Sequence, residues 1–181
     1  MKKSTRLLST AFLLLLIVSA CDHQKSLQAY IVNSSEKQGF MYGDLPVGLM
    51  LTPKEDASEA VKETIKSIKK MNVVFLKKTK ENAADYEIEK SKLKNIFTNK
   101  TYKTLGVFKT KGMNMKLYYT GQTDQINEVI AFGYGKKVGV GVARLLVKNM
   151  NPARIMEMMN NIQLDTNMIQ QGQFKTIFNG L

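Results

Sequence analysis

Cysteine, histidine and tryptophan are nearly missing from this chain of 181 residues, which has one cysteine, one histidine and no tryptophan. Because Cys21 is the single cysteine, the chain forms no disulfide within itself, and its stability must come from a packed core. The single histidine, His23, lies two residues from Cys21, ahead of the segment that is expected to fold. Histidine general bases, Ser-His or Cys-His pairs and histidine-built metal sites are therefore excluded from that segment.

Carboxylates are the remaining route to catalysis, since a glycosidase needs only two of them. The candidates are scattered along the chain, and nothing in the sequence brings any two together: Asp44, Asp85, Asp124 and Glu128. We therefore expect a protein that is not an enzyme, with no catalytic, cofactor-binding or metal-binding residues and no cofactor. A carboxylate-only hydrolase remains an alternative.

Arginine is scarce, although the chain carries a formal net charge of +12. Beyond Arg6, arginine occurs only at Arg144 and Arg154, and lysine supplies the other positive charges. The planar guanidinium group of arginine can form paired hydrogen bonds with a phosphate, whereas the ammonium group of lysine is a hydrated point charge. We therefore expect no nucleic-acid partner. Anionic lipid headgroups or acidic glycans are better counterparts, and a solvated lysine surface without a partner is the other reading.

Long apolar runs are also lacking, because the longest uncharged apolar stretch, Leu7–Val18, has 12 residues. A membrane-spanning helix needs about 20, whereas 12 suits the hydrophobic region of a signal peptide. Lys2, Lys3 and Arg6 precede it, and Val18-Ser19-Ala20-Cys21 follows and resembles a bacterial lipobox. We expect cleavage between Ala20 and Cys21 and lipidation of Cys21, so that its acyl chains hold the protein at a membrane. The alternative is an ordinary signal peptide followed by an incidental cysteine.

The hydrophobic pattern divides the chain into a signal peptide (1–20), a lipidated tether (21–25), one domain (26–163) and a C-terminal tail (164–181) that is possibly docked. Helices are expected over about 25–35, 52–70 and 83–98 and from 151, and strands over 40–45, 72–76, 105–110, 113–120, 126–134 and 138–147. Short turns between the last four strands make them antiparallel neighbours. The predicted class is α+β, a mostly antiparallel sheet with three to four helices on one face.

Three local signals support the helix boundaries. Thr52-Pro53-Lys54-Glu55 has the form of a capping box with proline at the first helical position, and Asn151-Pro152 repeats the cap and proline. In the helix over 83–98, the expected inward residues are Tyr86, Leu93, Ile96 and Phe97, and the expected wet residues are Glu87, Glu89, Lys90 and Lys94. In the tail, the apolar residues that could form a docked helical turn are Phe174, Ile177 and Phe178.

Glycine, methionine and lysine clusters each allow a structural and a functional interpretation. The glycines of G-Y-G-K-K-V-G-V-G predict a hairpin in which Gly135 supplies a positive φ and Gly139 and Gly141 leave a bare strand face. The methionines expected on the last helix fill the core, form a partner groove or bind copper(I): Met150, Met156, Met158 and Met159, with Met168 following. The lysines that flank strand 72–76 meet as a basic patch or stay apart and solvated: Lys66, Lys69, Lys70, Lys77, Lys78 and Lys80.

The lipobox and four further segments resemble one family. These segments are SLQAYIVNSSEKQGFMYGDLP (26–46), NVVFLKK (72–78), INEVIAFGYGKKVGVGVARLLV (126–147) and NMNPARIMEMM (149–159). They are similar to the Bacteroidota lipoproteins catalogued as domain of unknown function 4252, over roughly 26–163. The resemblance implies a compact domain on an outer-envelope lipoprotein and transfers no site residues.

We expect a lipid-anchored protein of the outer membrane, on its periplasmic face or surface, that works as a non-enzymatic binding or interaction module with a possible envelope protein partner. The alternatives are a periplasmic carrier or sensor of a small apolar or lipid ligand, and the carboxylate-only hydrolase. An apolar pocket would favour the carrier, paired buried carboxylates the hydrolase, and an exposed apolar strip beside Met158 the interaction module.

Replacing the lipid-accepting thiol tests the anchor. Cys21→Ser keeps the size of the side chain but removes the nucleophile, so the variant is expected to lose its lipid and partition into the soluble fraction. Fractionation with a mass measurement of the N-terminal peptide checks this. A variant that stays membrane-bound with an unchanged mass would contradict the lipobox assignment.

Overall fold

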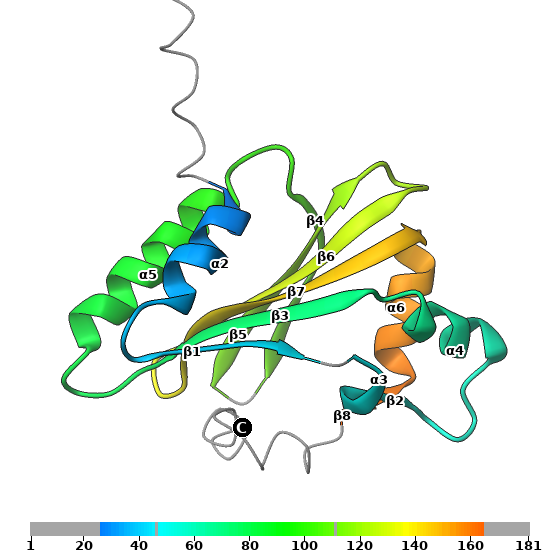
Figure 1. Ribbon diagram of the computed structural model, residues 1–181, viewed down its shortest axis with the longest axis horizontal. Helices are drawn as coiled ribbons and strands as arrows, with labels where there is room; N and C mark the ends of the chain where they lie inside the picture. The colour runs from blue at the N-terminus through cyan, green and yellow to red at the C-terminus, as the bar shows by residue number, and fades with distance from the viewer. Residues whose placement is uncertain (1–25, 46, 111, 165–181) are drawn as a thin grey trace, which may run out of the picture.

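The computed structural model describes residues 26–45, 47–110 and 112–164, which form a six-stranded antiparallel sheet flanked by helices (Figure 1). The elements in chain order are α2 (Leu27–Ser35), β1 (Phe40–Leu45), α3 (Val47–Met50), β2 (Leu51–Pro53), α4 (Glu59–Lys66), β3 (Lys70–Lys77), α5 (Ala83–Ile96), β4 (Lys103–Thr110), β5 (Met113–Gly121), β6 (Ile126–Gly135), β7 (Gly139–Met150), α6 (Pro152–Asn160) and β8 (Ile162–Leu164). The predicted α+β class with a mostly antiparallel sheet is confirmed.

Strand order in the large sheet is β1-β3-β7-β6-β5-β4, so β3, β7 and β6 are central. The last four strands follow one another as hairpins, as their short turns predict. Strand β3 lies between β1 and β7 and pairs with both, Leu76 opposite Phe40 of β1 and Lys77 opposite Gly139 of β7. Strands β2 and β8 form a separate two-stranded ribbon, which the sequence pattern does not predict.

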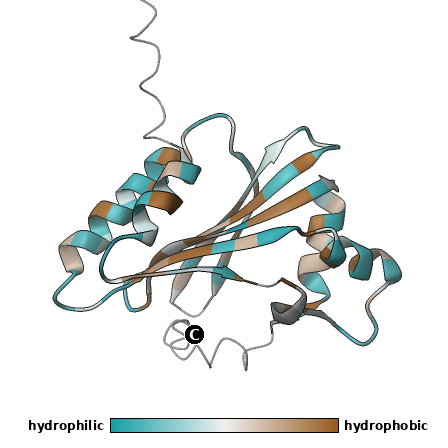
Figure 2. Cartoon of the chain, in the orientation of Figure 1, coloured by the Kyte–Doolittle hydropathy of each residue, from teal (hydrophilic) through white to brown (hydrophobic). Residues whose placement is uncertain are grey.

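Helices cover both faces of the sheet at opposite ends, which corrects the expectation of one covered face (Figure 1). On the upper face, α2 and α5 bury an aromatic cluster that includes Tyr86, Phe97, Tyr118 and Phe132. The ring of Phe97 is stacked on that of Tyr118 with centroids 4.4 Å apart. On the lower face, α4 and α6 cover a second cluster of aliphatic side chains and methionines. Brown, apolar stretches in Figure 2 run along the strands, while much of the outer helix surface is teal.

The helix predicted over 52–70 is wrong at both ends. Pro53 lies in β2 opposite Ile162, where a strand that lacks a second neighbour tolerates a residue without an N–H. Ser58 caps α4 instead, its hydroxyl accepting from the backbone N–H of Val61 at 3.3 Å, and Glu55 is exposed outside the helix. Helix α4 ends at Lys66 because residues 70–77 pair as β3, so Ile68 is buried after the helix and not in it.

The other helix boundaries follow their caps. The side chain of Ser26 accepts from the N–H of Ala29 at the start of α2, and that of Asn151 accepts from the N–H of Arg154 at the start of α6. Met150 ends β7 and is not part of α6. The predicted β6–β7 hairpin is present, but the positive φ belongs to Gly139, at 144°, and not to Gly135.

Removing the cap at Ser58 tests the corrected start of α4. Ser58→Ala removes the side-chain acceptor of the Val61 N–H, which keeps only the Ser58 carbonyl at 3.0 Å, and breaks the 3.0 Å bond from the Ser58 hydroxyl to Glu157 Oε1 on α6. The free energy of unfolding in urea should fall by ~1–2 kcal/mol. Thr52→Ala, at the cap the sequence predicts, should change it by less than ~0.5 kcal/mol. The opposite ranking of the two variants would restore the helix start at Thr52.

Candidate functional site

A groove separates α2 from α5 on the upper face, where the two helices lie side by side (Figure 1). Its main hollow has a volume of about 300 Å³ and is lined by Tyr30, Asn33, Ser34 and Lys37 from the α2 side and by Lys92, Asn95 and Ile96 from α5. Two adjoining hollows share Asn95 with it, and one of them extends to Ser26 and Tyr102 beside the first turn of α2. The groove therefore runs along α2 from its first turn to the loop after its end.

Three buried polar atoms lie together beneath this groove: Tyr30 Oη, Ser34 Oγ and Glu89 Oε2. None of them makes a hydrogen bond of ordinary distance and angle with the described residues. The Tyr30 hydroxyl nevertheless lies within hydrogen-bonding reach of both Ser34 and Glu89, whose side chains affect its pKa in this way. The three residues are 6%, 0% and 4% exposed, so all three are withdrawn from solvent. A buried polar group without a partner costs about 1–3 kcal/mol. Tyr30 and Ser34 also line the hollow, so they are the buried polar side chains that border on the space within the groove.

Glu89 carries the one buried acidic side chain among the described residues and is held by two lysines. Its Oε1 accepts from Lys92 Nζ at 2.8 Å and from Lys37 Nζ at 3.2 Å. Burial acts to raise the pKa of this carboxyl, but the hydrogen bonds from Lys92 and Lys37 outweigh it and the pKa is lowered. The carboxylate is therefore ionised at neutral pH and joins α5 to the end of α2.

The phenol of Tyr30 stays neutral in this setting. Burial is the largest cause that raises its pKa, and the negative charge of Glu89 raises it further. The Tyr30 hydroxyl also lies within hydrogen-bonding reach of Ser34 and Glu89. Tyr30 and Ser34 each have one O–H donor and acceptor lone pairs, so part of this capacity is shared among the three side chains. With amides from Asn33 and Asn95 at the rim, the groove is suited to a polar, hydroxyl- or amide-bearing molecule. The two lysine ammonium groups and the one carboxylate leave a net positive charge, so a ligand with one negative charge would be accepted.

Sequence reasoning placed Glu89 on the wet side of α5, which is wrong. Glu89 follows Tyr86 by three residues and precedes Leu93 by four, so it lies on the buried stripe of the helix. That spacing was the available signal. A buried acid between Tyr86 and Leu93 departs from the usual pattern in which the buried stripe of a helix is apolar. Departures of this kind are expected at functional sites. The inward positions of Tyr86, Leu93, Ile96 and Phe97 are confirmed, as are exposed Glu87 and Lys94, while Lys90 is half-buried.

The four carboxylates named from sequence do not form a site. Asp44 pairs with Lys70 at 2.6 Å, which together with the amide of Asn72 lowers the pKa of its carboxyl. Glu128 binds Arg144, whose guanidinium also reaches Gln28 on α2. Asp85 lies in the first turn of α5 and Asp124 in the exposed loop before β6. Within residues 26–45, 47–110 and 112–164, no group of three His, Cys, Asp or Glu side chains is placed to hold a metal ion.

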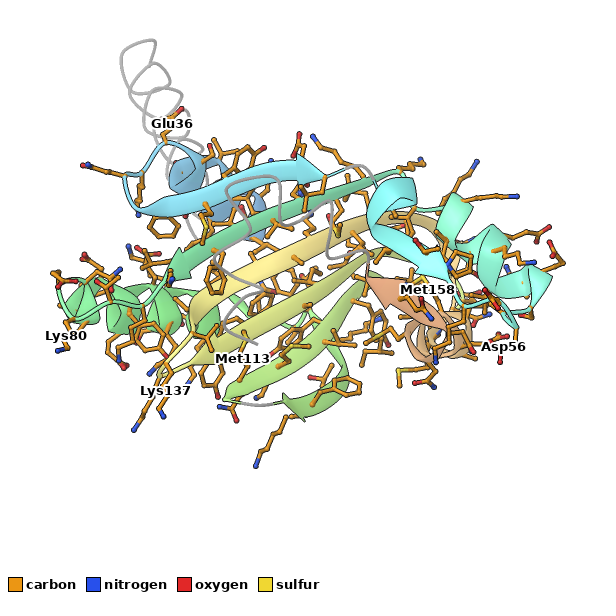
Figure 3. The ribbon with its side chains drawn as sticks, turned by 90° about the horizontal axis from the view of Figure 1, so that it is seen from below. Glu36, Asp56, Lys80, Met113, Lys137 and Met158 are labelled. Atoms are coloured by element: carbon orange, nitrogen blue, oxygen red, sulfur yellow. The ribbon has the colours of Figure 1, made fainter. Side chains whose placement is uncertain are left out.

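The lysine clusters on either side of β3 are apart, so the basic patch is wrong. Lys70 and Lys77 lie at opposite ends of the eight-residue strand β3, seven steps apart, which is ~23 Å at ~3.3 Å per residue. Lys80 lies at the end of the sheet away from α4 (Figure 3). In α6 Met158 is buried and Met156 and Met159 are half-buried, which favours the core interpretation. Exposed large apolar side chains among the described residues are Val32, Ile88 and Val107, and none belongs to α6.

The predicted signal peptide, Ala20–Cys21 cleavage site, Cys21 lipidation and His23 lie outside the described residues, as do Met168, Phe174, Ile177 and Phe178 of the tail. Among the helices that the structure describes, none has the length and apolar character needed to cross a membrane.

Comparison with known proteins gives one match. The model of the family described as Domain of unknown function (DUF4252) matches residues 30–158, which include most of α2, the whole six-stranded sheet and most of α6. No curated protein and no solved structure matches the chain. The matched region contains the groove residues from Tyr30 to Ile96.

Neutralising Glu89 tests the electrostatics of the groove. Glu89→Gln keeps the shape but removes the charge held by Lys37 and Lys92, so the free energy of unfolding at neutral pH should fall by ~1–3 kcal/mol. Because the folded-state pKa is lowered, the stabilisation by Glu89 is present above the unfolded-state pKa and is lost as pH falls through the folded-state pKa.

Urea unfolding of both proteins across acidic pH checks this. The difference between wild type and Glu89→Gln should shrink as pH falls below the ordinary pKa of a glutamate. Glu87→Gln, which alters an exposed pair with Lys90, is the matched control and should have a much smaller effect. A pH-independent difference for Glu89→Gln would contradict an ionised, lysine-held carboxylate.

Proposed function

The chain belongs to the family described as Domain of unknown function (DUF4252), and we propose that it is a lipid-anchored envelope protein that binds a small polar ligand in the α2–α5 groove. The observation that carries this proposal is a hollow of about 300 Å³ whose lining brings together the buried side chains of Tyr30 and Ser34, the amides of Asn33 and Asn95, and the ammonium groups of Lys37 and Lys92.

Attachment to the outer membrane rests on the sequence Val18-Ser19-Ala20-Cys21 and the short apolar run before it. Once Cys21 is the first residue, the tether 21–25 spans at most ~18 Å before Ser26 caps α2. The groove extends to Ser26 and Tyr102, so its near end lies within that reach of the lipid surface. A ligand carried on, or released from, envelope lipids or glycans would meet the groove directly.

Binding fits this site better than hydrolysis. A carboxylate-only glycosidase needs a second carboxyl about 5–10 Å from the first. Glu89 is the one buried acid of the described residues, and its Oε1 is occupied by two lysine ammonium groups. The lining with Asn33, Ser34 and Asn95 also favours a polar ligand over the small apolar ligand of a lipid carrier.

Native mass spectrometry of the mature protein, extracted gently from its own membrane, tests the ligand and the anchor together. The wild type should retain an added mass of about a few hundred daltons, the usual size for a pocket of this volume. Asn33→Ala with Asn95→Ala should lose it, since both rim amides are removed from exposed positions.

Asn114→Ala with Asn160→Ala removes two exposed amides far from the groove and is the matched control, which should retain the added mass. Equal retention by both double variants would place the ligand elsewhere. A bare polypeptide plus its acyl groups in the wild type would contradict ligand binding while leaving the lipid anchor supported.

A further inference from the structure

The lower face of the sheet carries a methionine-rich surface at the end away from α4 and α6. We call it the methionine surface and define it by Met41 of β1, Val73 and Phe75 of β3, and Met113 and Met115 of β5. The upper cluster beneath α2 and α5 contains no methionine among the described residues. Seen from below, Met113 and Met158 lie at different ends of this face, and the helices at the Met158 end do not extend to Met113 (Figure 3).

Four glycines make this surface flat. Gly133 pairs with Gly141 and Gly135 with Gly139 across the β6–β7 hairpin, so the middle of the surface has no side chains of its own. A Cβ on Gly133 would lie 2.8 Å from Met113 Cε, and one on Gly141 would lie 2.8 Å from Phe75 Cδ2. The flanking Met113 and Phe75 side chains therefore lie across the glycines and present a continuous, low apolar floor.

This floor is withdrawn from water although no described helix lies over it. Phe75 is 5% and Met113 8% exposed, and Met41, Val73 and Met115 are half-buried. Methionine side chains are flexible and adapt to an irregular apolar partner. A second apolar layer is thus expected on this face, as in any sheet that buries both sides.

We propose that the C-terminal segment 165–181 is the occupant of the methionine surface and docks there as an amphipathic helical turn. Its apolar residues Phe174, Ile177, Phe178 and Leu181 follow the i, i+3, i+4, i+7 spacing of one helix face. Asp165 and Lys175 are its only charged residues, so its charge does not oppose burial.

The segment has the reach to do so. It continues from Leu164 at the end of β8, and the ten residues from there to Phe174 span up to ~33 Å. Crossing the six strands of the sheet takes about 24 Å at ~4.8 Å per strand. The proposal concerns the lower face and does not depend on the groove, so either can fail alone.

The reactivity of a single introduced cysteine tests whether the methionine surface is covered. Because Cys21 is the one native cysteine and is consumed by the lipid in the proposed anchor, Val73→Cys in the full-length protein reports on the methionine surface. We expect maleimide labelling of Val73→Cys to be slow, and to become about tenfold faster or more when Phe174→Asp and Phe178→Asp are added, since tenfold corresponds to ~1.4 kcal/mol of docking.

Three controls make the result decisive. Gln170→Asp with Gln171→Asp adds the same charge off the apolar stripe and should leave labelling slow. Val107→Cys, 59% exposed, should label quickly in every background, and Val74→Cys, fully buried on the upper face, should stay unlabelled as long as the domain is folded. Labelling of Val73→Cys that is unaffected by Phe174→Asp and Phe178→Asp would overturn the proposal. Protection that disappears on dilution would also overturn it, because a second copy would then be the cover.

Discussion

The ion bridge from Lys37 through Glu89 to Lys92 is the interaction on which the candidate site depends. Taking a carboxylate out of water costs several kcal/mol, and the two ammonium groups offset that cost only while α2 and α5 keep their spacing. The bridge uses Oε1, while the same carboxylate lies within hydrogen-bonding reach of the Tyr30 hydroxyl. One charged residue thus links α5 both to α2 and to the loop after α2.

Helices cover one half of each face of the sheet, and the covered halves lie at opposite ends. The groove and the methionine surface therefore lie on different faces. Helices α2 and α5 pack on aromatic side chains above the sheet, and α4 and α6 pack on methionine and aliphatic side chains below it. The groove lies between α2 and α5, beside the residues that follow the proposed lipid anchor. The methionine surface lies on the other face, where the flat β6–β7 glycines leave space for one more layer. A ligand and the C-terminal segment would therefore not compete for one surface.

Local patterns in the sequence were sufficient for most of the fold, because hairpins and capped helices are decided by neighbouring residues. Strand β1 and the cap at Asn151 needed nothing beyond their own segments, and the closing hairpins followed from their turns. The predicted start of α4 at Thr52 is wrong because Pro53 pairs in a strand with Ile162 of β8, more than a hundred residues later. No local pattern contains that pairing.

The candidate site was missed for a related reason. Acidic residues in helices are usually solvated, and only the helical phase of Glu89 against Tyr86 and Leu93 argues otherwise. One partner, Lys92, follows Glu89 by three residues on α5, but the other, Lys37, lies in the loop after α2, some fifty residues away, and sequence spacing does not reveal it. The separate positions of Asp44 and Glu128 likewise depend on strand order, which brings Asp44 to Lys70 and Glu128 to Arg144.

A crystal structure of the protein purified from its own membrane tests the central claim most directly. A bound molecule is expected in the α2–α5 groove, with a donor or acceptor within about 3.2 Å of at least two of the side chains of Tyr30, Asn33, Ser34 and Asn95. A groove that contains only solvent would contradict ligand binding at this site.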